Sequence, residues 1–165
     1  DVCINNAGIN RLNFIDDVIM QDWDDMVAVN LTAPFLIMRD VVKKMKEQKY
    51  GRIVNIASIF GHISKAKRST YSATKFGLHG MTVAVANEVS CHGVLVNTVS
   101  PGFALTDLTR QNLSPAEMET LAEQIPVGRL AEPQEISRVV LFLASRLNTY
   151  VTGQNVIVDG GFVNV

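Results

Sequence analysis

The chain has 165 residues, of which 47% are hydrophobic and 19% are charged. This composition supports a sizeable core and excludes a globally disordered chain. Fifteen Lys and Arg against sixteen Asp and Glu leave a formal net charge of −1, which argues against a general nucleic-acid binder. The longest apolar run, residues 139–144, is far shorter than the roughly 20 residues that cross a bilayer, so we expect no membrane-spanning segment.

The first part of the chain is expected to form a strand followed by a long helix. Residues 2–4 are apolar and end at a turn-like Asn-Asn-Ala-Gly run, residues 5–8. Residues 22–45 carry apolar side chains every three or four positions, which indicates a helix. Pro34 has no N–H to donate, so the carbonyl of Asn30 loses its helical partner and the helix is expected to kink there.

The rest of the chain alternates in the same way. Strands are expected at residues 52–58, 94–99 and 155–158, helices at 71–90 and 133–145, and one or two short helices within 106–124. This alternation predicts parallel βαβ units. The strands are apolar without a clean polar alternation, which predicts helices on both faces of the sheet. The expected fold class is therefore α/β.

The strongest local chemical signal is Tyr71, followed four residues later by Lys75. On a helix these two positions share one face, and a cation beside a phenol lowers the pKa of that phenol toward neutrality. A tyrosine tuned in this way can exchange a proton near pH 7. Because Tyr and Lys at this spacing are common in helices, the pair alone does not establish a catalytic site.

Two further polar residues support such a site. Ser58 ends the second expected strand, at the sheet edge where ligands bind, and its hydroxyl can hydrogen-bond a substrate carbonyl oxygen. The free carbonyl of Asn30 can hold a water that connects Lys75 to solvent. Each also has a plain structural interpretation, since Ser58 can simply cap a turn and a kink at Asn30 can have no role.

Other chemistries fit the sequence less well. The three histidines are scattered and form no ligand pair, so no metal site is expected. Ser58 lies in Asn-Ile-Ala-Ser-Ile-Phe-Gly and not in the Gly-x-Ser-x-Gly turn of many hydrolases. Cys3 and Cys91 do not make a disulfide framework, and we interpret them as small buried residues of a reducing, cytoplasmic protein.

In combination, these motifs resemble the short-chain dehydrogenase/reductase family, in particular its 3-oxoacyl-(acyl carrier protein) reductases. The family's Asn-Asn-Ala-Gly motif matches residues 5–8, and its last strand and ending match residues 150–161. Its catalytic Asn, Ser, Tyr and Lys and its Pro-Gly turn with a following Thr match, in order and spacing, Asn30, Ser58, Tyr71, Lys75, Pro101, Gly102 and Thr106. The resemblance covers essentially the whole chain. It implies a Rossmann-type, doubly wound parallel sheet, of which these residues would form strands four to seven.

The same resemblance implies hydride transfer between a nicotinamide cofactor and a small carbonyl or secondary alcohol, such as a 3-oxoacyl, sugar or polyol substrate. Tyr71 would act as acid or base, and Lys75 would lower its pKa and hold the cofactor ribose. Ser58 would orient the substrate oxygen, and Asn30 would keep a relay water. The cofactor would contact Asn6, Ala7, Gly8, Tyr71, Lys75, Pro101, Gly102, Ala104 and Thr106. The family often has a branched apolar residue where Ala104 stands.

The resemblance also indicates what these residues do not contain. The family's glycine-rich phosphate loop and the residue that separates NAD from NADP come before residues 5–8, so the cofactor is expected to be NAD or NADP without a choice between them. Residue 1 is Asp, and no secretory leader precedes the first strand. We therefore expect residues 1–165 to be the C-terminal two-thirds of one Rossmann domain. Alone, they are expected to be inactive and to bind a dinucleotide poorly, with one sheet edge uncovered.

Three surfaces carry further expectations. Residues 71–90 are apolar nearly all round and, with residues 22–45, are expected to form the interface of a homodimer or homotetramer. The loop at residues 62–68 has three cations; a solvated loop is the favoured interpretation, and recognition of an anionic substrate or an acidic carrier protein is the alternative. Residues 106–124 are expected to form a substrate lid.

Two functions remain open on the sequence. The first is an NAD(P)-dependent oxidoreductase. The second is a catalytically silent family member, or fragment, that serves as a binding or oligomerisation module. The four matched catalytic residues favour the enzyme, because a silent relative more often has lost one of them.

Overall fold

The computed structural model describes residues 1–106, 109–110 and 113–164. Four strands form one parallel sheet in the order β1–β2–β3–β4: Val2–Asn5, Gly51–Ile56, Val94–Pro101 and Asn155–Val158. Every neighbouring pair of strands is parallel. The expected α/β class is confirmed, and the strands lie close to their predicted positions.

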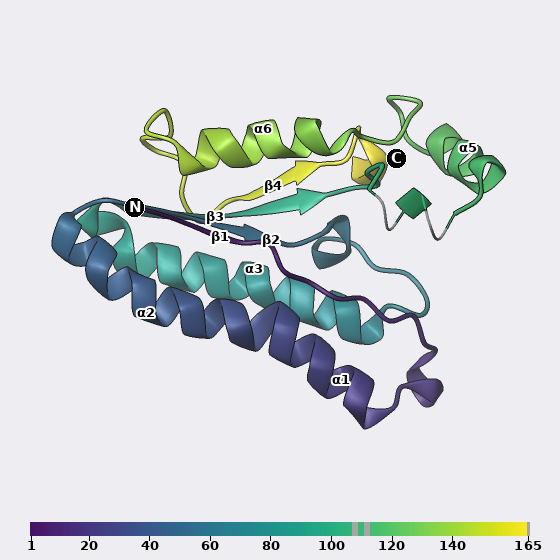
Figure 1. The fold of residues 1–165 in the computed structure, drawn as a ribbon, viewed down its shortest axis with the longest axis horizontal. Helices are drawn as coiled ribbons and strands as arrows, with labels where there is room; N and C mark the ends of the chain where they lie inside the picture. Colours follow the sequence, from purple (N-terminus) through teal and green to yellow (C-terminus); the bar gives the residue numbers. More distant parts are fainter. Residues whose placement is uncertain (107–108, 111–112, 165) are drawn as a thin grey trace.

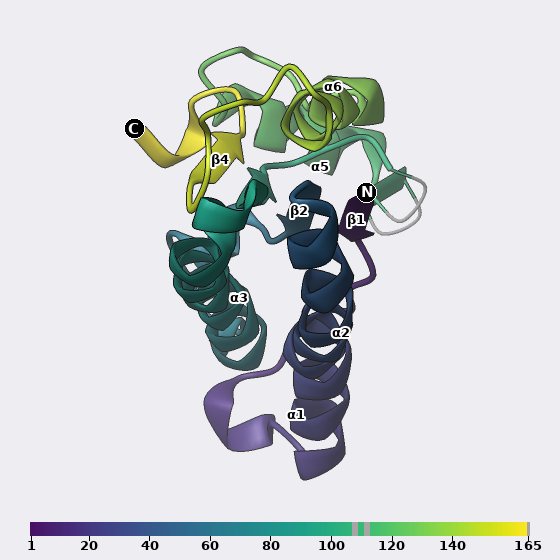
Figure 2. The same cartoon turned by 90° about the vertical axis from the view of Figure 1, so that its left-hand side faces the viewer.

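Helices cover both faces of this sheet. The helices are α1 (Met20–Val27), α2 (Ala33–Gln48), α3 (Ser69–Val89), α5 (Pro115–Glu123) and α6 (Pro133–Ala144). Figures 1 and 2 show α2 and α3 side by side on one face and α6 on the other. This is the doubly wound arrangement that the alternation of strands and helices predicts.

The two faces of the sheet form two separate parts of the core. Successive side chains of a strand point to opposite faces, so Ile53 and Val54 of β2 are both fully buried but in different layers. Ile53 belongs to the cluster that also contains Met38 of α2 and Ala86 of α3. Val54 packs with Leu143 of α6. The sheet is therefore buried on both sides, which is why its strands lack polar alternation.

The predicted kink at Asn30 is a turn of π-helix. Ala28–Thr32 form this turn between α1 and α2, and the N–H of Ala33 donates to the carbonyl of Ala28. Pro34 cannot donate to the carbonyl of Asn30, and a wider turn accommodates the missing hydrogen bond without ending the helix. The turn leaves the side chain of Asn30 fully buried.

Three features describe the outside of the fold. On β1, which forms one edge of the sheet, Val2 and Ile4 are 47% and 45% exposed. The prediction that Cys91 is buried is wrong, because its side chain is exposed. Cys91 lies in the short 3-10 turn Ser90–His92, which follows the end of α3. Within the described ranges, no helix combines the length and the apolar character needed to cross a membrane.

Candidate active site

The residues singled out from the sequence meet at the carboxyl edge of the sheet. Asn5 ends β1, Ser58 lies just beyond β2, and Pro101 ends β3. Because the strands are parallel, these ends lie at the same edge, and α3 begins there. Ligands of doubly wound folds bind at this edge.

Ser58 has both a structural and a chemical role available to it. Its Oγ accepts a hydrogen bond from the N–H of Phe60 at 3.2 Å and so caps the short turn Ile59–Gly61. Accepting this bond leaves the hydroxyl proton free to be donated elsewhere. A Cβ on Gly61 would lie 2.9 Å from the carbonyl oxygen of Lys75, so only glycine lets this turn pack so closely on α3. That close packing holds Ser58 beside the first turns of α3.

Tyr71 and Lys75 share one face of α3, as their spacing predicts. The ammonium of Lys75 lies 5.6 Å from the centre of the Tyr71 ring. Lys75 is only 3% exposed, and its Nζ donates to the carbonyl oxygen of Ile56 at 2.9 Å. The lysine is therefore anchored to the end of β2, next to the tyrosine.

Burial changes the proton affinities of both side chains. It lowers the pKa of Lys75 to about 8, because a buried ammonium loses its hydration. Burial also raises the pKa of Tyr71, while the Ser58 hydroxyl and the positive charge of Arg68 act in the opposite direction. Burial outweighs both, so the pKa of Tyr71 lies above its ordinary value, whereas the sequence predicted a pKa lowered toward neutrality.

Asn30 contributes through its side chain, which the sequence analysis did not consider. Its Oδ1 accepts from the N–H of Ile9 and its Nδ2 donates to the carbonyl of Ile9, both at 2.9 Å. Nδ2 also contacts Oγ1 of Thr74 at 3.2 Å, and Thr74 donates to the carbonyl of Tyr71 at 2.7 Å. Asn30 thus ties the segment after β1 to α3. Thr74 was missed, although its position between Tyr71 and Lys75 could have suggested it.

Some of the expected cofactor contacts line a common cavity, and the others lie outside its lining. Asn6, Pro101, Ala104 and Thr106 line one cavity of about 600 Å³, together with Ile4, Ile56 and residues of α6. A Cβ on Gly8 would lie 3.3 Å from Nζ of Lys75, so this glycine allows the segment after β1 to pass close to the lysine. Ala7 is exposed beside it, and Gly102 packs against Asp159 outside the cavity lining.

This cavity suits a flat ring that bears a polar group. Ile4 and Ile56 supply apolar surface, while Asn6 and Thr106 supply hydrogen-bonding groups. Binding pockets for organic cofactors typically combine such apolar walls with a few polar groups. The residues present therefore fit a nicotinamide, whose ring carries a carboxamide.

A second cavity, of about 800 Å³, lies between three loops and α5. Its lining includes residues 65–68, Phe103 and residues of α5, together with Asn10 and Leu12. Part of the expected lid, residues 107–108 and 111–112, lies outside the described residues. The described remainder contributes α5, which forms one wall of this cavity.

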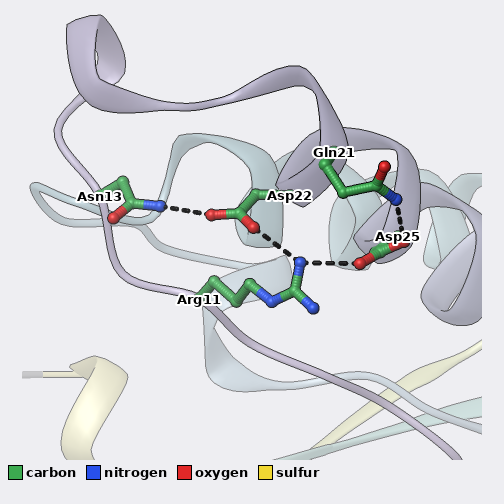
Figure 3. A network of polar contacts seen from close by, with 5 residues as sticks. All are labelled: Arg11, Asn13, Gln21, Asp22 and Asp25. Carbon is green, nitrogen blue, oxygen red and sulfur yellow. Dashed lines mark hydrogen bonds and ion pairs between the residues drawn. The ribbon is translucent and has the colours of Figure 1, made fainter.

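Figure 3 shows how the loop at residues 10–13, which follows β1, is held in place. One guanidinium nitrogen of Arg11 donates to Asp22 at 2.7 Å and to Asp25 at 2.8 Å, and Asn13 donates to Asp22 at 2.9 Å. These contacts fasten the loop to the first turns of α1. They thereby place the neighbouring Asn10 and Leu12 in the wall of the second cavity.

The comparisons with known proteins agree with this geometry. The profile of the family described as "Enoyl-(Acyl carrier protein) reductase" matches residues 1–163. The 3-oxoacyl-(acyl carrier protein) reductase FabG of Aquifex aeolicus is 44% identical over 161 residues, which is 98% of this chain and 64% of that protein. The chain thus spans slightly less than two thirds of this curated relative.

Two solved structures share the fold over the whole chain. A gluconate 5-dehydrogenase from Burkholderia cenocepacia, in complex with NADP and tartrate, has a TM-score of 0.95 and 30% identity, with 65% of its chain covered. A 4-hydroxyisoleucine dehydrogenase mutant, complexed with NADH and succinate, has a TM-score of 0.94 and 34% identity, with 69% covered. From the profile, the relatives and the shared fold, we conclude that the chain belongs to the short-chain dehydrogenase/reductase family.

Proposed function

We propose that this chain is the catalytic part of an oxidoreductase that transfers a hydride between NAD or NADP and a carbonyl or secondary alcohol. One observation carries the proposal: Tyr71, Lys75 and Ser58 meet at the carboxyl edge of a parallel sheet, beside a cavity that fits a nicotinamide. The dehydrogenases and the reductase that the chain resembles support the same reaction class.

In this proposal the bound cofactor supplies or accepts the hydride, and the protein positions the reactants and moves the proton. Asn6, Pro101 and Thr106 would hold the nicotinamide portion. The Ser58 hydroxyl donates to the substrate oxygen and orients it. Tyr71 gives a proton to that oxygen during reduction and takes it back during oxidation.

Lys75 and Asn30 support this proton transfer. Lys75 has a pKa of about 8, so its ammonium can release and regain a proton close to neutral pH. It lies against Gly8 and the carbonyl of Ile56, where it can also contact a ribose hydroxyl. Asn30 holds Ile9 and Thr74, and so keeps the segment after β1 and the helix that carries Tyr71 in register.

The test of this function is Tyr71→Phe in the full-length polypeptide. Removal of the phenol oxygen should lower kcat by roughly 10²–10⁴-fold, the usual contribution of general acid–base catalysis, without weakening cofactor binding. Turnover is followed by nicotinamide absorbance and cofactor binding by calorimetry. Tyr150→Phe is the matched control, because Tyr150 is 94% exposed and belongs to neither cavity. Unchanged turnover in Tyr71→Phe removes Tyr71 from the acid–base role and favours a silent family member.

We further propose that the working enzyme contains a phosphate-binding βαβ segment that pairs with β1. Among the described residues, the outward side of β1 has no strand beside it and carries a half-exposed apolar side chain, Val2, which another strand and its helices would cover. Calorimetry that finds tight NADPH binding to residues 1–165 alone would contradict this proposal.

We also propose a cytoplasmic homodimer or homotetramer that associates through residues 22–45 and 71–90. Phe35 on α2 and Phe76 on α3 are nearly half exposed, and Ala73, Gly80 and Ala84 leave one face of α3 flat and uncharged. Such a face suits close contact with another helix. Light scattering that finds only a monomer of the full-length protein would contradict the assembly.

A further inference from the structure

We propose that the substrate carries an anionic group, a carboxylate or a phosphate, and that Arg68 binds it. This proposal rests on the proposed function, because it assigns the substrate class of the same active site. It concerns the cavity of about 800 Å³ whose lining includes Lys65, Lys67 and Arg68 from the loop between β2 and α3.

Among the three cations that line this cavity, Arg68 is the one that also lies near Tyr71. Its guanidinium stacks on the ring of Phe60 at 4.0 Å and lies 5.9 Å from the centre of the Tyr71 ring. The residue is half-buried, yet among the described residues it forms no ion pair, and its buried Nε has no hydrogen-bond partner. A half-buried guanidinium normally binds a carboxylate or phosphate, so a ligand that brings such a group would complete this site.

The two lysines add positive charge to the same wall. Lys65 lies 5.6 Å from the ring of Phe60, and Lys67 lies 4.6 Å from the ring of Phe14. Lys67 also adopts a positive φ of 66°, which is unusual for a residue other than glycine. Aromatic rings, and not acidic side chains, hold these cations in the part of the chain that the structure describes, so their charge stays available to a ligand.

The cavity wall offers little to neutralise this charge. Glu117 is the one carboxylate among the described lining residues. Its Oε2 accepts from the N–H of Ser114 at 2.8 Å and from its hydroxyl at 2.7 Å, as the cap of α5. Three cations therefore face a single carboxylate that already has partners, and the cavity attracts anions.

The geometry favours a small anion over an acidic carrier protein. Arg68 and Lys65 lie over the same ring, Phe60, in the lining of the cavity. Lys65 and Lys67 are exposed, whereas Arg68 is half-buried, and a half-buried guanidinium suits a small group that enters the cavity better than the broad surface of a carrier protein. Because Arg68 also contacts the region of Tyr71, the anionic group must lie only a few bonds from the reacting carbon. Short hydroxy or oxo acids, or their phosphate counterparts, meet that requirement.

Calorimetry on the full-length protein tests this inference with succinate, inorganic phosphate and succinamide as probes. Succinamide has nearly the shape of succinate without its charge. Each probe is titrated with and without NADP, and NADP is titrated separately. We expect succinate or phosphate to bind at least tenfold more tightly than succinamide, and Arg68→Gln to weaken that anion at least tenfold. Tighter binding of succinate identifies a carboxylate as the favoured group, and tighter binding of phosphate identifies a phosphate ester.

Arg146→Gln is the matched control variant. Arg146 also stacks on an aromatic ring, Tyr50 at 4.8 Å, but it follows α6 at the opposite end of the sheet and should leave anion binding unchanged. Arg68→Lys retains the charge but loses the planar guanidinium, so it should bind the anion more weakly than wild type and more tightly than Arg68→Gln. If the glutamine variant does not fold, the loss in Arg68→Lys relative to wild type is the test.

Two results would overturn the proposal: equal binding of succinate, phosphate and succinamide, or unchanged anion binding when the charge of Arg68 is removed. Its failure can be told apart from failure of the proposed function. If the protein binds the anion through Arg68 but shows neither NADP binding nor turnover, the anion site stands and only the proposed oxidoreductase function is contradicted.

Discussion

The two sides of the active site are built in different ways. On the catalytic side, Lys75 and Asn30 are buried and hydrogen-bonded to backbone groups of Ile56 and Ile9. On the side of the second cavity, Lys67 and Arg68 lie over aromatic rings. Among the described contacts, neither side chain forms a hydrogen bond to the backbone. Directional bonds to the backbone fix the first set, whereas stacking tolerates changes in the second.

In the proposed function, this difference separates the residues of the reaction from those of substrate specificity. The groups that move a proton must hold one geometry, because misplacement by about 1 Å can cost 10²-fold in rate. The groups that select a substrate can vary while the sheet, α3 and the Asn30 contacts stay the same. Substitutions on the catalytic side should therefore disturb the whole protein more than substitutions around the second cavity.

The largest effect on stability is expected from Asn30→Ala. The variant leaves the N–H and carbonyl of Ile9 without their partner and removes the contact with Thr74, so we expect the free energy of unfolding to fall by about 2–4 kcal/mol. Urea unfolding of the full-length protein measures this change. Asn13→Ala is the control, because Asn13 makes one partly buried contact with Asp22 and should cost less than about 1 kcal/mol. Equal losses in the two variants would contradict the distinction between the two sides.

A smaller effect should appear in the pH dependence of stability through Lys75. Its pKa of about 8 in the folded protein lies below the ordinary value of 10.5, so the unfolded chain binds more protons between these values. The contribution of Lys75 to the free energy of unfolding must then rise with pH, by about 1–2 kcal/mol between pH 7.5 and 9.5. Lys75→Met removes this dependence, and the stability difference between wild type and variant should change by that amount. A difference that does not vary with pH would show that Lys75 keeps an ordinary pKa.

The smallest effect is expected from Arg11→Ala in the loop at residues 10–13. The two ion pairs of Arg11 with Asp22 and Asp25 are partly exposed, and pairs of this kind contribute less than about 1 kcal/mol. The loss of stability should therefore stay below that value and shrink further at high salt, as seen by urea unfolding at two salt concentrations. A loss as large as that of Asn30→Ala would show that this loop is as firmly integrated as the catalytic side.

Much of the fold could be predicted because local patterns and global structure agree. The apolar runs at residues 52–58 and 94–99 became the central strands β2 and β3, and the helix expected at residues 71–90 ends at Val89. The common face of Tyr71 and Lys75 follows from helical spacing alone. Cys91 shows the limit of such reasoning, because its apolar character predicted burial although it lies beyond the packed face of the helix.

By itself, the sequence determined the parallel α/β class, the order of its elements and the set of residues that meet at the carboxyl edge, since spacing and chain direction decide all three. Only the tertiary structure decided how those residues act on one another. The partners of Asn30 lie 21 and 44 positions away along the chain, and burial raises the pKa of Tyr71 against the opposing effects of Ser58 and Arg68. Burial and contacts between distant segments set both results, and neither has a signature in local sequence.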